Sequence, residues 1–166
     1  MDREVPEDNL EPSAKVAIQA TEELVNYIQD LTQTSDSPLI RPIITPRFAI
    51  SCTPELLRGL GNLAAKYDPP LHIQTHIGEN LDEVAKVGEL FPGNTSYADV
   101  YDSFGLLGEK TILGHAAYLG DDEVDLIAKR KAGISHCPTS NFNLTSGVAP
   151  VGKYLDAGIK VNFLFM

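Results

Sequence analysis

The chain has 166 residues, of which 43% are hydrophobic and 22% charged, a composition typical of a globular protein with a sizeable core. Its length suits one domain but is short for a complete eight-stranded α/β barrel, which needs roughly 200 residues or more. The formal net charge of -10, from 13 Lys and Arg against 23 Asp and Glu, disfavours nucleic acid or an anionic membrane as a partner.

Neither a membrane span nor a secretory signal is expected from the sequence. No run of residues is apolar over the length that a bilayer requires, and the first residues do not resemble a signal peptide. The two cysteines, Cys52 and Cys137, are too few for a disulfide framework. We therefore expect a soluble, cytoplasmic protein with reduced thiols.

The first elements are one helix and one strand. Residues 1–11 are polar and acidic and are expected to form a loop. From Ser13, a candidate N-cap, apolar residues recur at helical spacing until the polar run at 34–38 ends the helix. The apolar positions of this helix are Ala17, Ala20, Leu24, Ile28 and Leu31. A strand ending near residue 45 and a loop through 46–48 are expected to follow.

Two further helices have clear starting signals. Thr53 can cap the first, with Pro54 at its first helical position and Glu55 near the positive end of its dipole. A strand over 71–77 comes next. Asn80 with Glu83 then forms a capping-box pattern, which predicts the start of another helix.

The second half of the chain repeats this alternation. A strand at 111–117 precedes a helix at 121–131, whose first turn is acidic and whose last is basic, with Gly133 as its stop. A strand at 134–137, a loop, a short helix at 150–157 and a strand at 159–165 follow. Five strands alternating with helices predict an α/β fold, a parallel sheet built of βα units.

All four histidines lie on or at the ends of these predicted strands. In α/β sheets and barrels the carboxyl ends of the strands carry the functional site. His76, His115 and His136 are therefore expected to converge there from three strands. One such histidine alone would be read as structural, but three at equivalent strand ends favour a site.

Alternation along the strand at 71–77 sharpens this expectation. One face carries Ile73 and Ile77, and the other carries His72, Gln74 and His76. Polar side chains that face a barrel interior are costly unless they are paired, so a metal or a hydrogen-bond network should satisfy them. The alternative is a solvent-facing polar stripe on an antiparallel edge strand.

Glu79 follows His76 by three residues, and Gly78 permits a turn between them. A carboxylate folded back toward the histidine could take a proton from a metal-bound water and pass it to a leaving amine. The alternative is that Glu79 only favours the positive end of the helix that Asn80 caps.

Other chemistries are not indicated. The His-x-x-Glu pair follows a strand, unlike the helical His-Glu-x-x-His of zincin proteases, and the pieces of a cytidine-deaminase-type zinc site are missing. Gly-rich phosphate-binding loops are also absent. Cys137 could be a nucleophile beside His136, but a buried structural thiol fits the sequence better.

Four strings of residues together resemble the amidohydrolase superfamily, and most closely its guanine deaminases. They are TPRFAISC at 45–52, HIQTHIGEN at 72–80, GHA at 114–116 and HCPTSN at 136–141. They occur in the family's order, and the likeness covers almost the whole chain, weakest before residue 38. The first two strings are specific to guanine deaminase-like members, and the last recurs in related aminohydrolases.

The resemblance implies a TIM-type (β/α)8 barrel that deaminates guanine hydrolytically to xanthine and ammonia, using zinc. By it, His76 and His115 would be zinc ligands and Glu79 the catalytic proton shuttle. His136 would be a catalytic residue beside the attacking water or the substrate.

The resemblance also implies a purine-binding set. Arg47 would hydrogen-bond the carbonyl edge of the purine, and the Phe48 ring would pack on its face. His76 and Glu79 would border the same small-molecule substrate.

Two departures from the family's pattern stand out. The family carries a His-x-His pair on its first barrel strand and a metal-binding Asp in a Gly-Thr-Asp string on its last, and this sequence has neither. A catalytic zinc usually takes three protein ligands, so the zinc site is expected to be incomplete. We therefore expect residues 1–166 to form a partial barrel domain of about five strands, truncated at both ends and weakly active or inactive alone.

Open sheet edges would favour self-association or a homo-oligomer. Two other functions stay open. One is a sister aminohydrolase acting on another nucleobase, a nucleoside or a triazine. The other is a non-catalytic fragment that associates with a full-length subunit.

Overall fold

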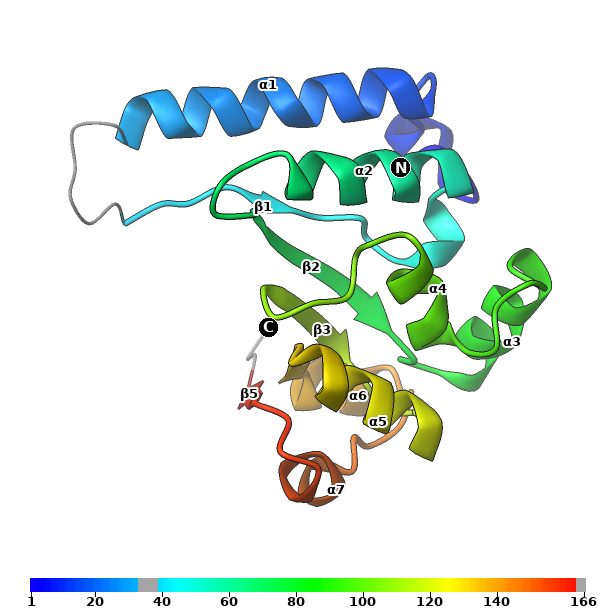
Figure 1. Cartoon of the computed structure of the whole chain (residues 1–166). Helices are drawn as coiled ribbons and strands as arrows, with labels where there is room; N and C mark the ends of the chain where they lie inside the picture. The colour runs from blue at the N-terminus through cyan, green and yellow to red at the C-terminus, as the bar shows by residue number, and fades with distance from the viewer. Residues whose placement is uncertain (33–38, 164–166) are drawn as a thin grey trace.

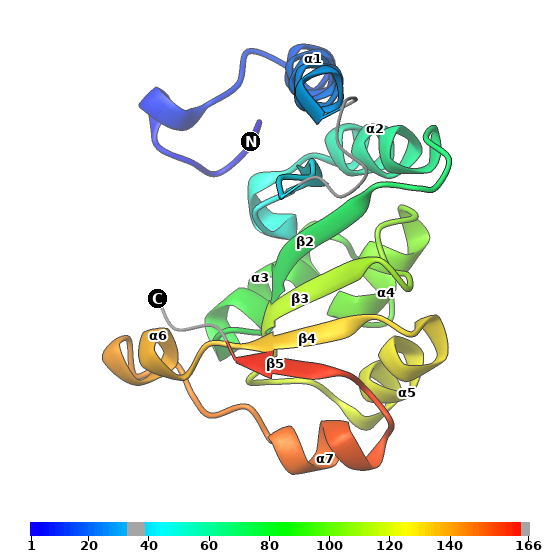
Figure 2. The ribbon, with the colours of Figure 1, turned by 90° about the vertical axis from the view of Figure 1, so that its left-hand side faces the viewer.

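The computed structural model describes residues 1–32 and 39–163. Its strands form one parallel sheet in chain order. They are β1 (Ile43–Ile44), β2 (His72–Ile77), β3 (Thr111–His115), β4 (Gly133–His136) and β5 (Val161–Phe163). Figure 2 shows β2 to β5 side by side. The sheet confirms the predicted α/β fold of parallel βα units.

Helices connect the strands and cover the sheet (Figure 1). They are α1 (Ala14–Thr32), α2 (Pro54–Ala65), α3 (Leu81–Leu90), α4 (Tyr97–Ser103), α5 (Asp121–Arg130), α6 (Pro138–Asn143) and α7 (Val151–Asp156), with 3-10 turns η1 (Glu7–Asn9) and η2 (Ala49–Ser51). α1 packs on α2 at the β1 end of the sheet, and α7 lies near β5. None of the described helices is long and apolar enough to cross a membrane.

The predicted capping residues begin their helices. The Thr53 hydroxyl accepts a hydrogen bond from the Leu56 amide at 3.2 Å, and the Asn80 side chain accepts one from the Glu83 amide at 2.8 Å. The capping box at α3 is only half formed, because the Glu83 carboxylate binds the Glu79 amide at 3.0 Å. The Glu83 side chain thus reaches past the cap into the segment that follows β2.

α5 ends differently from the prediction. It stops at Arg130 with Lys131 in the left-handed conformation at φ 58°, and Gly133 is the first residue of β4. The amides of Lys131 and Ala132 turn back to the carbonyls of Ala128 and Ile127, so the last turn closes without a glycine.

Two short helices were not expected. α4 lies in a segment without a predicted element, and α6 occupies a predicted loop. Each has a local starting signal, Ser96 as a cap and Pro138 at the first helical position, but too few residues for helical periodicity to be visible. β3 is shorter than predicted, because His115 and Ala116 have φ values of 68° and 51° and turn the chain out of the sheet.

The predicted apolar stripe of α1 matches its buried face only in part, at Ala17. Ala14, Ala17 and Val25 are buried, whereas Leu24 and Leu31 are 58% and 64% exposed. Within the described residues α1 packs mainly on one neighbour, α2, and this contact covers only part of its apolar surface. The predicted helix end at 34–38 lies outside the described residues.

The predicted alternation along β2 is confirmed. Ile73, Thr75 and Ile77 are buried on the side covered by helices, whereas Gln74 is exposed and His76 is half-buried. Gln74 is satisfied by a hydrogen bond that its amide donates to the Thr45 hydroxyl at 3.1 Å. The polar face of the sheet therefore carries the candidate site.

Candidate functional site

His76 and His115 meet at the carboxyl ends of β2 and β3. Gly114 lies opposite His76 and His115 opposite Ile77 in the parallel ladder. The two imidazole ring centroids are 4.9 Å apart and their planes make an angle of 84°. A Cβ at Gly114 would lie 3.2 Å from the His76 ring, so the glycine leaves room for this ring on β3. The predicted convergence of these two histidines is thus observed.

A strained turn presents His115. Positive φ at His115 and Ala116 costs these side-chain-bearing residues about 1–2 kcal/mol each. The turn is held because the Ala116 amide donates to the Ile77 carbonyl at 2.9 Å. His115 is buried, and its Nδ1 lies 2.8 Å from Asn141 Oδ1. With the proton on Nδ1, this hydrogen bond leaves the lone pair of Nε2 free.

Glu79 reaches the histidines through the turn at Gly78. Gly78 has φ 53°, and a Cβ there would lie 2.5 Å from the Tyr118 carbonyl oxygen, so no other residue fits without a shift. After this turn Glu79 Oε1 lies 3.5 Å from His115 Nδ1. The geometry gives Glu79 a position beside the histidines in addition to its place before α3.

Arg47 and Phe48 lie next to His76. The Arg47 carbonyl accepts a hydrogen bond from the His76 amide at 3.0 Å, which carries the pairing of the two segments beyond β1. The Arg47 guanidinium carbon lies 5.3 Å from the centre of the Phe48 ring, a cation-π contact. The Arg47 side chain is exposed, so its hydrogen-bond donors remain available.

The surroundings keep two of the histidines neutral. Burial, followed by the nearby His115 and Arg47, lowers the pKa of His76 to about 4. Burial and His115 also lower the pKa of His136. Neutral imidazoles at pH 7 are able to act as metal ligands or hydrogen-bond acceptors.

His136 is the last residue of β4 and lies at the same end of the sheet. It is 6% exposed, and its Nδ1 has no hydrogen-bond partner among the described residues. Its ring contacts Phe163 of β5 edge-on, with 5.6 Å between centroids. The structure therefore leaves a buried polar atom of His136 unused beside the candidate site.

Cys137 fits a structural thiol. It is buried, and its Sγ lies 3.3 Å from the Ser135 carbonyl oxygen, which accepts its hydrogen bond. Burial raises the pKa of the Cys137 thiol, which opposes formation of a nucleophilic thiolate. Cys52 is also free and buried, and burial raises the pKa of its thiol.

The described residues supply part of a zinc site. The imidazoles of His76 and His115 are two potential donors in contact, but residues 1–32 and 39–163 hold no group of three or more His, Cys, Asp or Glu able to bind a metal. A catalytic zinc usually takes three protein ligands. The present donor set therefore does not by itself fit a complete catalytic zinc site.

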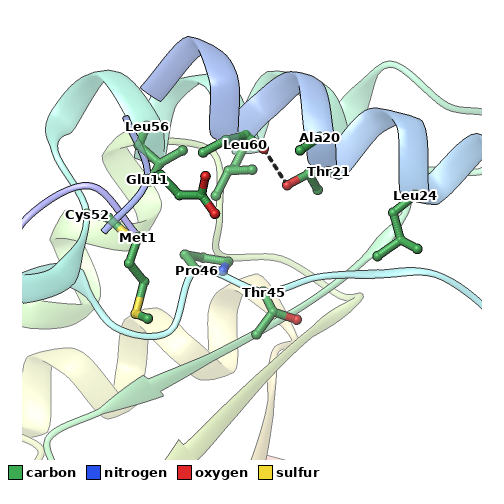
Figure 3. Close-up of a pocket in the computed structure, with 11 residues that line it drawn as sticks. Met1, Glu11, Ala20, Thr21, Leu24, Thr45, Pro46, Cys52, Leu56 and Leu60 are labelled. Carbon is green, nitrogen blue, oxygen red and sulfur yellow. Dashed lines mark hydrogen bonds between the residues drawn. The ribbon is translucent and has the colours of Figure 1, made fainter. Parts of the chain in front are cut away.

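Two hollows differ in their surroundings. One of about 310 Å³ lies on the polar face of the sheet, lined by residues that include Thr45, Gln74, His76 and Gly114. Another, of about 240 Å³, lies between the N-terminal segment, α1 and α2 (Figure 3). Glu11 lines the second hollow, but no histidine does, so the candidate site is at the first.

Sequence reasoning missed several polar residues around this site. Tyr97 and Tyr101 lie on the unpredicted α4, four residues apart, and their rings stack at 5.3 Å. For Glu83 the sequence predicts only a capping role. Asn141 stands in the HCPTSN string, which was the one available signal for a role beside His115.

The amidohydrolase family model matches residues 1–165. The chain belongs to the amidohydrolase family. Among its relatives, the probable guanine deaminase of Schizosaccharomyces pombe is 52% identical over 94% of this chain and 29% of its own length. The guanine deaminase of Dictyostelium discoideum is 45% identical over 97% of this chain and 34% of its own length. This amidohydrolase chain thus spans about a third of the length of these relatives.

Solved structures give the same picture. The guanine deaminase from C. acetobutylicum, with guanine bound in its active site, superposes with a TM-score of 0.90 and 43% identity over 98% of this chain and 37% of that one. The E. coli guanine deaminase gives 0.89 and 33% identity over 98% and 36%. This likeness confirms the predicted partial barrel.

Proposed function

We propose that this chain carries the purine-handling part of a zinc-dependent guanine deaminase, which hydrolyses guanine to xanthine and ammonia. The observation that carries the proposal is the approach of three predicted site residues at two strand ends. The His76 and His115 rings are 4.9 Å apart, and Glu79 Oε1 is 3.5 Å from His115 Nδ1. The relatives and solved structures named above support the choice of guanine.

In this proposal His76 and His115 would be two ligands of the zinc, a set that the described residues do not complete. Glu79 acts as general base and then general acid. Its carboxylate takes a proton from the attacking water and delivers it to the leaving amine, so that ammonia departs. Glu79 lies beside the buried His115 and is partly shielded from solvent, which suits proton transfer.

Substrate recognition is proposed for the loop after β1. The exposed guanidinium of Arg47 would donate hydrogen bonds to the purine carbonyl, and the Phe48 ring would pack on the purine face. His76 lines the hollow of about 310 Å³ on the sheet face, and Glu79 is proposed to border the purine there. His136, whose Nδ1 has no partner among residues 1–32 and 39–163, would contact the substrate or the attacking water.

The rest of the proposal concerns the whole chain. Residues 1–166 are proposed to form one partial barrel domain that is weakly active or inactive alone, because the part of the chain that the structure describes does not supply a complete set of zinc ligands. Two free, buried thiols are compatible with a reducing cytosol. Self-association through the exposed edges of β1 and β5 is proposed as the main protein contact.

A specific observation supports each of two alternative functions. A triazine hydrolase variant superposes with a TM-score of 0.82 at 25% identity, which keeps a sister aminohydrolase in view. The incomplete set of zinc ligands among the described residues supports the second alternative, a non-catalytic fragment.

Guanine binding to the purified, zinc-supplemented chain tests the substrate, and xanthine release tests the activity. We expect calorimetric binding of guanine, with little xanthine formed. Arg47→Ala should weaken guanine binding at least about tenfold, because it removes charge-assisted hydrogen bonds. The matched control is Arg41→Ala, an exposed arginine on the approach to β1.

Each outcome has a definite meaning. Absence of guanine binding contradicts the substrate proposal, and tighter binding of a triazine favours the sister aminohydrolase. Rapid xanthine release by the chain alone contradicts the proposed low activity.

A further inference from the structure

The hydroxyl of Tyr101 is a buried junction between segments that carry the candidate site. Tyr101 has no exposed surface. Its Oη accepts hydrogen bonds from the Ala49 amide at 3.1 Å and the Thr75 hydroxyl at 2.9 Å. It donates to the His76 carbonyl at 2.6 Å. One donor and two acceptor sites are thereby used, which is the full capacity of a phenol.

Each partner of this hydroxyl adjoins a proposed site residue. Ala49 follows Phe48 directly, and the bonded carbonyl belongs to His76 itself. Thr75 precedes His76, and its hydroxyl also lies 3.4 Å from the Arg47 carbonyl oxygen. A single side chain on α4 therefore touches both the end of β2 and the loop that follows β1.

Tyr97 extends the network to Glu79. Its hydroxyl lies 3.3 Å from Tyr101 Oη and accepts a second hydrogen bond from the Ala49 amide at 3.4 Å. It donates to Glu83 Oε1 at 2.8 Å. Glu83 Oε2 accepts the hydrogen bond of the Glu79 amide at 3.0 Å. Glu83 is 6% exposed, so little solvent reaches this chain of contacts, and this burial raises the pKa of its carboxyl.

The short β1 strand explains why such a junction is needed. β1 is only two residues long, and beyond the single bond from the His76 amide to the Arg47 carbonyl the backbone leaves the ladder and runs into the protein at the buried Ala49. Buried backbone amides there must find other partners. An apolar residue at 101 would fill the same volume but leave the Ala49 amide and the His76 carbonyl without this partner.

We infer that Tyr101 is a positioning residue that fixes the Arg47–Phe48 loop against His76, and that Tyr97 and Glu83 extend this control to Glu79. The catalytic consequence of this positioning rests on the proposed function. Tyr101 itself does not touch the proposed substrate and acts through the backbone of the residues that do.

Amide hydrogen exchange of the full chain, followed residue by residue by NMR, tests the inference. Tyr101→Phe should speed exchange of the Ala49 amide at least about tenfold, because the amide loses the nearer of its two acceptors and keeps only Tyr97 Oη at 3.4 Å. Tyr97→Phe should instead speed exchange of the Glu79 amide, because Glu83 loses its donor. Tyr154→Phe is the matched control, since Tyr154 is equally buried and its hydroxyl also donates to a backbone carbonyl, that of Ala116 at 2.5 Å.

A purely structural role makes a different prediction. It would speed exchange throughout the chain in Tyr101→Phe and Tyr154→Phe alike, in step with their melting temperatures. Unchanged exchange at Ala49 in Tyr101→Phe, or only this uniform acceleration, would overturn the inference.

Guanine affinity supplies a second readout through a double-mutant cycle. Tyr101→Phe should weaken binding about fivefold in the wild-type chain but less than about twofold in the Arg47→Ala background, because both act through the same loop. Equal effects in the two backgrounds would contradict positioning through Arg47. If the wild-type chain does not bind guanine, the proposed function fails, and the exchange experiment still decides the role of Tyr101.

Discussion

Asn141 fixes one of the two converging histidines. It is 1% exposed, and its Oδ1 accepts the hydrogen bond of His115 Nδ1 at 2.8 Å. Histidine metal ligands commonly donate their second N–H to such an acceptor, which sets the tautomer and the ring orientation. Asn141 is therefore the residue through which zinc affinity of this chain should be most easily altered without removing a ligand.

Asn141→Ala is expected to lower the zinc affinity of the chain about tenfold. The reason is that the His115 ring loses the hydrogen-bond acceptor that orients it. Both imidazole ligands are still present in this variant. Competition with a chromophoric chelator measures this affinity directly. Asn143→Ala, on an exposed residue at the end of the same short helix, should bind zinc like the wild type. Equal loss in both variants would contradict the expectation.

At the scale of elements, two helix ends carry features that a single substitution can test. α5 ends on a lysine in the left-handed conformation, where glycine is the usual residue. α4 begins under Ser96, and the carboxylate of Asp99 in its first turn accepts the Thr95 amide at 2.9 Å. Both ends lie at the surface, so neither test disturbs the core.

Lys131→Gly is expected to stabilise the chain by about 0.5–1 kcal/mol, because φ 58° carries no penalty for glycine. Chemical denaturation monitored by circular dichroism gives the difference in unfolding free energy. Lys129→Gly, inside the same helix, should destabilise the chain by a similar amount. Destabilisation by Lys131→Gly would contradict the assigned conformation.

Asp99→Asn is expected to destabilise the chain at pH 7 by about 0.5 kcal/mol, a value that allows for solvent screening at this partly exposed group. The Thr95 amide holds the pKa of Asp99 below its usual 3.8. A lowered carboxyl pKa contributes stability that is complete above pH 3.8 and is lost as the pH falls below it. The gap between the two proteins should therefore be present at pH 7 and shrink toward pH 3. A gap independent of pH in urea titrations would exclude this ionic contribution.

At the scale of the whole molecule, the surface is large for the mass. The accessible area is 9401 Å², whereas a folded monomer of 18.0 kDa is expected to expose about 8,000 Å². Part of the excess is apolar, including Leu24, Tyr27 and Leu31 on α1 and Ile112 on the sheet face. The short strands β1 and β5 also form the two edges of the described sheet. These surfaces favour association.

We expect the chain to sediment as species larger than a monomer as its concentration is raised. Leu24→Lys with Leu31→Lys adds charge to the exposed face of α1 and leaves the sheet edges unaltered, so association through the edges should persist. Loss of association in this variant would assign the contact to α1 instead. A monodisperse monomer at every concentration would contradict the prediction.

The sequence alone determined the alternation of strands and helices, the two faces of β2 and the strand-end histidines, because each depends on local periodicity or on a short motif. His76, His115 and Glu79 could be selected in advance since the alternation of β and α units brings equivalent strand ends to one edge. The family could be recognised because its site residues lie in four short strings that can be read directly from the sequence. The turn at Gly78 was also predictable, because glycine alone accepts its geometry.

Only the tertiary structure decided the rest. Which face of α1 is buried depends on the single helix that packs against it, not on the spacing of its apolar residues. The short helices α4 and α6 hold too few residues for periodicity to appear, and their stability comes from packing. The contacts of Asn141 with His115 and of Tyr101 with Ala49 and His76 join residues 26, 52 and 25 positions apart, so no local pattern encodes them.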